Sequence, residues 1–276
     1  MPAPNAISPE KLARLIGTPK TPLLLDIRSD EDRAADPRLL PGALAVGDRA
    51  PTALAAELAG RPSIAICQAG HKRSQGAAAW LRAEGCPSEY LEGGFEAWRE
   101  AGLPLLDTRH LPPRDGQGRT VWVTRARPKI DRIACPWLIR RFVDPRAVFL
   151  FVAPAEVEGV AERYGAAPFD VENVFWSHRD ALCTFDVMLS EFGLSLPALK
   201  RLAVIVRGAD TARLDLAPEA AGLLAASLGL SRMHADDLEQ LDAGMLIYDA
   251  FYRWARDATD ETHNWPTNKP GPHGPQ

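Results

Sequence analysis

The chain has 276 residues and a mass of 30.1 kDa, a length that favours two domains over one. Hydrophobic residues make up 46% and charged residues 25% of the composition, which excludes a wholly disordered chain, a collagen-like chain and a small disulfide scaffold. Acidic residues outnumber basic ones and the formal net charge is −4, so we expect no nucleic-acid partner.

The first third of the chain alternates short apolar runs with helical patterns, as parallel α/β domains do. Ser8-Pro9-Glu10 is a helix start signal, and Gly93-Gly94 is a turn signal. We predict strands and helices in the chain order 9–16 (helix), 23–27 (strand), 52–59 (helix), 63–67 (strand), 74–84 (helix), 88–91 (strand) and 95–101 (helix).

Residues 107–119, DTRHLPPRDGQGR, have the composition of a linker between domains. We therefore place one domain at 1–106 and a second at 120–258. The second is predicted to be an α-rich α+β domain, with strands at 121–124 and 148–152 and helices at about 131–143, 155–164, 185–192, 197–207, 218–228 and 235–257. Residues 259–276 are rich in proline and glycine, and we predict a disordered tail.

Four cysteines, at positions 67, 86, 135 and 183, form no Cys-x-x-Cys pair, so we expect thiols rather than disulfides. The first residues, MPAPNAISPEKLARLIG, do not have the pattern of a signal peptide. No apolar run approaches the ~20 residues that span a bilayer. These features predict a cytoplasmic protein without a membrane partner.

Cys67 lies between a predicted buried strand and the start of a helix, in the segment SIAICQAGHKRS. In such a loop the backbone N–H groups converge, and the helix dipole and neighbouring cations add positive charge, which stabilises a thiolate and a bound anion. We predict a nucleophilic Cys67 in an anion-binding loop. The loop residues assigned to this role are Gln68, Ala69, Gly70, His71, Lys72, Arg73 and Ser74.

This part of the chain resembles the rhodanese family over about residues 5–106. The resemblance rests on four motifs in the family's order: LLLDIR at 23–28, Pro-Gly-Ala at 41–43, the Cys67 loop, and YLEGGFEAW at 90–98. It implies a parallel sheet with helices on both faces, and a Cys67 persulfide that takes sulfur from a small anionic donor and passes it to a thiophilic acceptor. It also implies that Asp26 and Arg28 support the loop, and it brings no cofactor.

The loop departs from the usual rhodanese pattern, because Arg73 lies six positions after Cys67. Cys-x5-Arg is the spacing of rhodanese-fold phosphatases and arsenate reductases, in which an arginine fork pairs with the oxygens of a tetrahedral anion. Those phosphatases usually have histidine before the cysteine, where this chain has Ile66. Phosphatase or oxyanion reductase chemistry at Cys67 therefore remains an alternative to sulfur transfer, with Arg73 as an oxyanion-binding residue.

The second domain begins with a basic run, TRARPKIDRIACPWLIRRFVDP, that contains Arg132, Cys135 and Arg140. Pro136 is typical of a first helical turn, so Cys135 is expected near a helix N-terminus that stabilises a thiolate. These three residues are candidates for an oxyanion-binding or redox site. The alternative is that Cys135 is a small core residue of an amphipathic helix.

His178, Cys183 and Asp186 lie within nine residues of one another, but their spacing matches no standard zinc motif. We therefore predict no metal site there, with metal binding by these three residues as the less favoured alternative.

This half resembles the C-terminal domain of the ChrB-type chromate-resistance family over about residues 119–258. Its motifs are the basic run above, FDV at 169–171, His178, CTFD at 183–186, VRGADT at 206–211, PEAAGL at 218–223, SLGLS at 227–231 and YDAFY at 248–252. The resemblance implies a role in chromate resistance. The leading hypothesis is thus a sulfurtransferase of the thiosulfate sulfurtransferase type linked to oxyanion stress. A second alternative, beside phosphatase or oxyanion reductase chemistry, is a non-enzymatic oxyanion or redox sensor.

Overall fold

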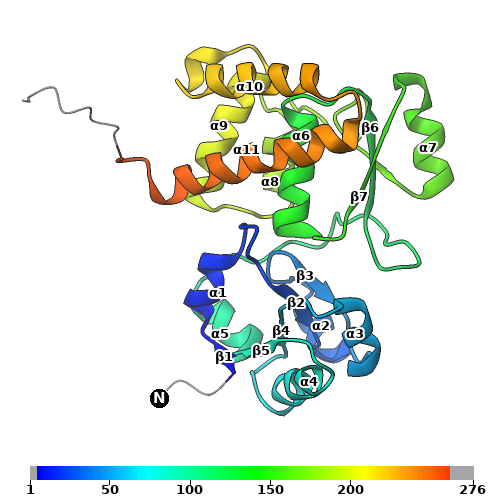
Figure 1. Cartoon of the computed structure of the whole chain (residues 1–276), viewed down its shortest axis with the longest axis vertical. Coiled ribbons are helices and arrows are strands. Elements are labelled where there is room, and N and C mark those ends of the chain that lie inside the picture. Colours follow the sequence, from blue (N-terminus) through cyan, green and yellow to red (C-terminus); the bar gives the residue numbers. More distant parts are fainter. Residues whose placement is uncertain (1–4, 262–276) are drawn as a thin grey trace, which may run out of the picture.

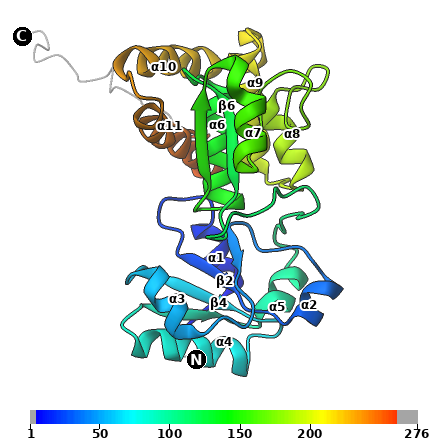
Figure 2. The same cartoon turned by 90° about the vertical axis from the view of Figure 1, so that its right-hand side faces the viewer.

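The structure is a computed structural model that describes residues 5–261, and it contains two parallel sheets, one in each half of the chain (Figure 1). Most of the tail predicted to be disordered, residues 262–276, lies outside the described residues. Figure 2, turned by 90°, shows the sheet of the first half below and that of the second half above.

The first sheet has the order β1-β5-β4-β2-β3, with every pair parallel. Its strands are β1 (Ala6–Ile7), β2 (Leu23–Asp26), β3 (Ala43–Ala45), β4 (Ser63–Ile66) and β5 (Ser88–Leu91). The helices are α1 (Pro9–Leu15), α2 (Asp30–Ala35), α3 (Pro51–Leu58), α4 (Lys72–Ala83) and α5 (Gly94–Glu100). Every element predicted in this half is present. The short elements β1, α2 and β3 were not predicted.

Alternating side chains place helices on both faces of this sheet. Leu24 and Ile64 pack in one apolar cluster with α1 and α5, whereas Leu25 and Ala65 pack in another with α3 and α4. Ser8 caps α1 by accepting a hydrogen bond from the Lys11 amide, as its position before a proline predicts. The predicted fold class is therefore confirmed for this half.

The second half is a helix-rich domain around a small sheet of order β7-β6-β8. Its strands are β6 (Val121–Arg125), β7 (Val148–Val152) and β8 (Ala167–Pro168). Its α-helices are α6 (Asp131–Leu138), α7 (Val157–Tyr164), α8 (Thr184–Glu191), α9 (Pro197–Asp210), α10 (Ala220–Met233) and α11 (Asp237–Asp257). Short 3-10 segments span Pro154–Glu156 and Leu214–Leu216. The helix predicted at 131–143 is present but ends in a π-helical turn, Ile139–Val143.

The two halves share one apolar core. Phe142, from the π-helical turn, accepts a hydrogen bond from the Gly42 amide (2.6 Å) through its carbonyl. Its ring packs so closely on Gly17 that an added Cβ there would lie 2.3 Å from it. The connecting segment is also held on the second half, because the Asp107 amide donates to the Phe192 carbonyl (2.9 Å) and Arg114 pairs with buried Asp144 (3.1 Å).

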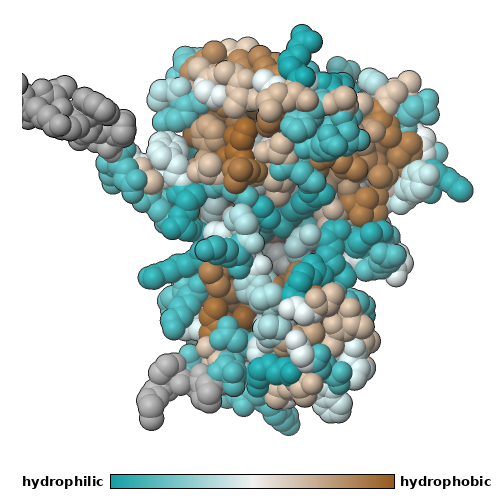
Figure 3. All heavy atoms as spheres, in the orientation of Figure 1, coloured by the Kyte–Doolittle hydropathy of each residue, from teal (hydrophilic) through white to brown (hydrophobic). Residues whose placement is uncertain are grey.

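Several large apolar side chains remain exposed, and apolar atoms gather on the second half in the face drawn in Figure 3. Those on α10 and α11 are Leu228, Met233, Leu238 and Leu246. Within residues 5–261, no helix combines the length and the apolar character needed to cross a membrane.

Candidate active site and a second polar cluster

Cys67 follows β4 directly, and a tight loop carries the chain from it to the first residue of α4, Lys72. The Cys67 side chain is buried, with 5% of the residue exposed. Its Sγ lies 3.1 Å from the Oγ of Ser74, which also donates to the His71 carbonyl (3.3 Å). Ser74 therefore acts inside the loop, and the residue at the N-cap of α4 is His71.

Amides at the N-terminus of α5 bind carbonyl groups of this loop. The amides of Phe95 and Glu96 donate to the carbonyls of Cys67 and Gln68, each at 3.0 Å. The backbones approach so closely that a Cβ on Gly94 would lie 2.3 Å from the Cys67 carbonyl oxygen, and Gly94 has a positive φ of 62°. Only glycine fits such a contact, which explains the glycine pair in YLEGGFEAW.

The α5 amides bind the Cys67 and Gln68 carbonyls and leave the N–H groups of the loop free to bind a ligand. Within residues 5–261, no amide from Gln68 to Ser74 donates a hydrogen bond to another protein group. Seven consecutive amides that follow Cys67 are therefore left without a protein partner in the described part of the chain, as an anion-binding loop requires. Ala69 and Gly70 contribute backbone only, while the side chains of His71 and Lys72 are exposed to solvent.

Asp26 and Arg28 form a buried ion pair (2.8 Å) next to this loop. The Arg28 guanidinium also donates to the carbonyls of Asp36 and Arg38, and it lies 3.8 Å above the ring of Phe95. Since the Phe95 amide binds the Cys67 carbonyl, this pair supports the loop through α5 and does not touch the thiol.

Arg73, predicted to provide an arginine fork for a bound anion, is paired with other protein groups in this structure. Its Nε donates to the Ile27 carbonyl (3.1 Å), and its guanidinium forms an ion pair with Asp48. The side chain therefore binds the end of β2 and the segment after β3. The Cys-x5-Arg spacing fixes the position of the residue but not the direction of its side chain.

The candidate site at Cys135 is not formed either. Cys135 is completely buried in the core, and burial, with the neighbouring Asp131, raises the pKa of its thiol well above the usual range. Arg132 binds Asp170 (3.2 Å), and Arg140 binds Asp242 (3.1 Å) on α11. The alternative expectation, a small core residue, is the correct one for Cys135.

Four arginines of the basic run that suggested an oxyanion site are paired with carboxylates from distant parts of the chain. Besides Arg132 and Arg140, Arg125 pairs with Asp170 (3.6 Å) and Arg141 with Asp249 (2.7 Å). These partners follow the run by tens of residues, so the local sequence could not show them.

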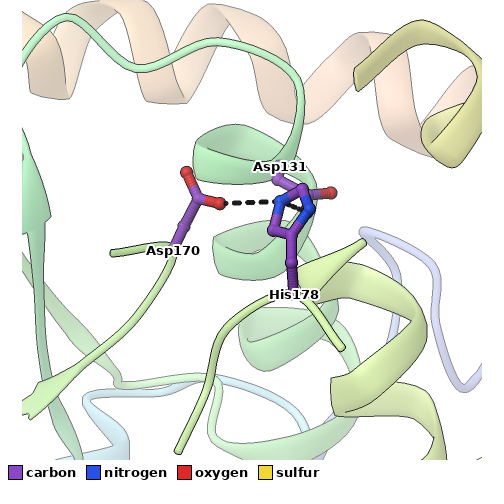
Figure 4. A group of neighbouring side chains, drawn as sticks. All are labelled: Asp131, Asp170 and His178. Carbon is purple, nitrogen blue, oxygen red and sulfur yellow. Dashed lines mark ion pairs between the residues drawn. The ribbon is translucent and has the colours of Figure 1, made fainter. Parts of the chain in front are cut away.

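His178, Cys183 and Asp186 do not come together. Cys183 and Asp186 cap α8: the Asp186 carboxylate accepts from the Cys183 amide (3.2 Å) and pairs with Arg207 (2.9 Å). His178 instead faces Asp131, Asp170 and Asp210, as Figure 4 shows for the first two.

This polar cluster of Asp131, Asp170, His178 and Asp210 was not predicted. Asp131 begins α6, Asp210 ends α9, and Asp170 and His178 lie in the segment between β8 and α8. Each residue belongs to a different motif of the ChrB resemblance, which was the signal available in the sequence. The hydrogen bonds that His178 donates to Asp170 and Asp210 raise the pKa of His178 to about 10. Burial, followed by the charges of Asp210 and Asp170, raises the pKa of Asp131.

Two known protein families match separate parts of the chain, one in each half. Residues 8–101 match the rhodanese-like domain, and residues 122–255 match the ChrB C-terminal domain. Protein ChrB of Cupriavidus metallidurans is 34% identical over 155 residues, which cover 55% of this chain. The match spans only 46% of that relative's length.

Solved structures similar to this chain include a rhodanese-related protein from Thermoplasma volcanium, with 21% identity and a TM-score of 0.29 over 37% of this chain and 96% of that one. Another is a thiosulfate sulfurtransferase from Pseudomonas aeruginosa, with 29% identity and a TM-score of 0.30 over 38% of this chain and 20% of that one. The family matches define the two halves described above: the chain joins a rhodanese-like domain to a ChrB C-terminal domain.

Proposed function

We propose that the first domain is a sulfurtransferase that carries sulfur as a persulfide on Cys67. The observation that supports this most strongly is the run of amides from Gln68 to Ser74, directly after Cys67, that donate to no other group in the described part of the chain. Their positive ends stabilise an anionic sulfur atom attached to Cys67 without any metal or cofactor.

The reaction has two steps. The Cys67 thiolate attacks the sulfane sulfur of a donor such as thiosulfate, the S–S bond of the donor breaks, and sulfite leaves with the electron pair. A thiophilic acceptor such as cyanide then attacks the terminal sulfur, and Cys67 leaves as a thiolate. The loop amides stabilise the anionic sulfur in both steps, and exposed Lys72 and His71 attract the anionic donor.

The pairing of Arg73 favours this reaction over phosphatase or oxyanion reductase chemistry. Both alternatives need an arginine fork directed at the oxygens of a bound tetrahedral anion. Here the guanidinium is occupied by the Ile27 carbonyl and Asp48, while the backbone amides that a persulfide needs have no protein partner.

We propose further that sulfur transfer serves resistance to chromate or a related oxyanion, because the chain carries a ChrB C-terminal domain. A host strain complemented with the Cys67→Ser variant should then lose chromate tolerance that the unmodified chain restores. Equal tolerance with both chains would separate the resistance from sulfur transfer.

The activity is tested on the full chain by measuring thiocyanate formed from thiosulfate and cyanide, alongside hydrolysis of an aryl phosphate. We expect thiocyanate but no phosphate release, and loss of the activity in Cys67→Ser. Cys86→Ser is the matched control, because Cys86 is buried in the same core and its thiol donates to the Ala55 carbonyl (3.6 Å). Thiocyanate formation by Cys67→Ser would disprove the proposal, and a folded chain without either activity would favour a sensor.

A further inference from the structure

The polar cluster of the second domain contains more carboxylates than hydrogen bonding requires. His178 Nε2 lies 3.3 Å from Asp170 Oδ1, 3.3 Å from Asp210 Oδ2 and 3.6 Å from Asp131 Oδ2. One imidazole nitrogen donates a single N–H, so it satisfies only one of these acceptors well. Their convergence needs another explanation.

The distances agree with those between ligands of one cation. Ligand atoms about 2.1 Å from a common metal ion lie roughly 3.0–3.4 Å apart when the bond angles are near 90–110°. The ligand atoms of Asp131, Asp170 and His178 all lie within 4.8 Å of one another, whereas Asp210 Oδ2, 3.3 Å from His178 Nε2, lies outside that group of three. A small movement of these side chains would bring them around a single ion.

Asp131 provides an independent indication of a missing ligand. It is completely buried, and its Oδ2 accepts hydrogen bonds from the amides of Thr184 (2.6 Å) and Phe185 (3.3 Å) at the start of α8. Its Oδ1 is buried too, yet it has no hydrogen-bond partner within the described part of the chain. A buried carboxylate oxygen without a partner is costly, and a bound cation or its water would compensate it.

The surrounding charges leave room for a divalent ion. When a cation displaces the protons of His178 and Asp131, the imidazole is neutral and the three carboxylates carry three negative charges. The two arginines at Asp170 Oδ2, Arg125 and Arg132, offset two of these charges. Asp170 Oδ1, which faces His178, also accepts from the Thr184 hydroxyl (3.1 Å), so this oxygen is oriented.

Solvent reaches the cluster from the His178 side. The His178 side chain is 41% exposed, whereas those of Asp210 and Asp170 are 19% and 10% exposed. Asp131 closes the inner end. A cation can therefore enter past the imidazole and keep water in its remaining coordination positions.

We propose that Asp131, Asp170, His178 and Asp210 bind one divalent first-row transition-metal ion, with Mn²⁺ or Fe²⁺ as the class of ligand. Carboxylate oxygens suit Mn²⁺, and an imidazole nitrogen suits Fe²⁺ and the later metals, so a set of three carboxylates and one imidazole fits these two ions best. This site is separate from the Cys67 loop and does not depend on the proposed sulfur transfer.

The test is titration of the chelator-treated full chain with Mn²⁺, followed by the loss of the free-ion signal in electron paramagnetic resonance. We expect one ion per chain. Asp131→Asn, which keeps an acceptor for the Thr184 amide, and His178→Gln, at a half-exposed position, should each weaken binding at least about tenfold. The control is Asp180→Asn, an exposed carboxylate in the same loop with a positive φ that asparagine tolerates, and its binding should stay within about twofold of the unmodified chain.

Circular dichroism of each variant establishes that it is folded. If the folded, unmodified chain binds no Mn²⁺ or Fe²⁺, the proposal is wrong. If His178→Gln and the Asp180→Asn control bind equally well, the ion lies elsewhere and the proposal is also wrong.

Discussion

The Cys67 loop and the polar cluster of the second domain are built in opposite ways. The loop is one contiguous segment whose chemistry comes from backbone amides, and the helix N-terminus of α5 positions it. The polar cluster gathers side chains from positions 131, 170, 178 and 210, and its chemistry comes from carboxylates. A site made of backbone should be sensitive to changes in chain geometry and tolerant of changes in nearby charge, whereas a site made of side chains should show the reverse.

The largest effect is expected on stability, at the buried ion pair of Asp26 and Arg28, where a substitution leaves a buried charge unpaired. Arg28→Met removes the partner of buried Asp26 and two hydrogen bonds to carbonyls, so it should lower the free energy of unfolding by about 3–5 kcal/mol. Denaturant unfolding measures this. The double variant Asp26→Leu with Arg28→Met should recover part of the loss, because no unpaired charge then remains buried. A loss that grows in the double variant would show that the pair has a role beyond mutual neutralisation.

The second largest effect is expected from a substitution that changes the backbone geometry of the loop. Gly94→Ala should lower the free energy of unfolding by about 2–4 kcal/mol and sulfur transfer by at least tenfold, because its Cβ would meet the Cys67 carbonyl in a left-handed conformation. Unfolding curves and the thiocyanate assay measure the two effects.

The matched control for Gly94→Ala is Gly76→Ala on the exposed side of α4, where an added Cβ meets nothing within 4 Å. This change should stabilise the helix by up to about 1 kcal/mol and leave the activity unchanged. Similar losses of activity in both variants would show that the close contact between Gly94 and the loop is not what matters.

The smallest effect is expected from a nearby charge. Arg73→Ala should raise the KM for thiosulfate by about threefold or less, because the guanidinium is already paired with Asp48, half-exposed, and not directed at the loop amides. Steady-state kinetics measure this change. An increase of tenfold or more would mean that Arg73 turns to the anion when the donor binds, which would restore the phosphatase-like interpretation.

The first domain could be predicted because its signals are local. Short apolar runs predicted buried strands such as Ser63–Ile66, and Ser8-Pro9 marked the start of α1. The Cys67 site is also local, since its loop and helix follow one another in the chain. The strands β1, β3 and β8, each of two or three residues, are too short to produce a periodic pattern.

The second domain shows what local patterns miss. The local sequence around Arg132 and Arg140 indicated a basic patch. In the structure each of these arginines is paired with a carboxylate from a distant part of the chain, Asp170 and Asp242 respectively. Cys135 looked like a residue at a helix start, but the packing around it is decided by tertiary contacts. The polar cluster depends on the same long-range convergence, and only the separate ChrB motifs that contain its residues pointed to it.

Locating the transferred sulfur shows whether Cys67 carries the persulfide. The full chain is incubated with thiosulfate, freed of the donor, and analysed by mass spectrometry of the intact protein and its peptides. We expect one additional sulfur atom per chain, located on Cys67, removed by cyanide and absent from Cys67→Ser. Additional sulfur on Cys86, Cys135 or Cys183, or on the Cys67→Ser chain, would show that Cys67 is not the sulfur carrier.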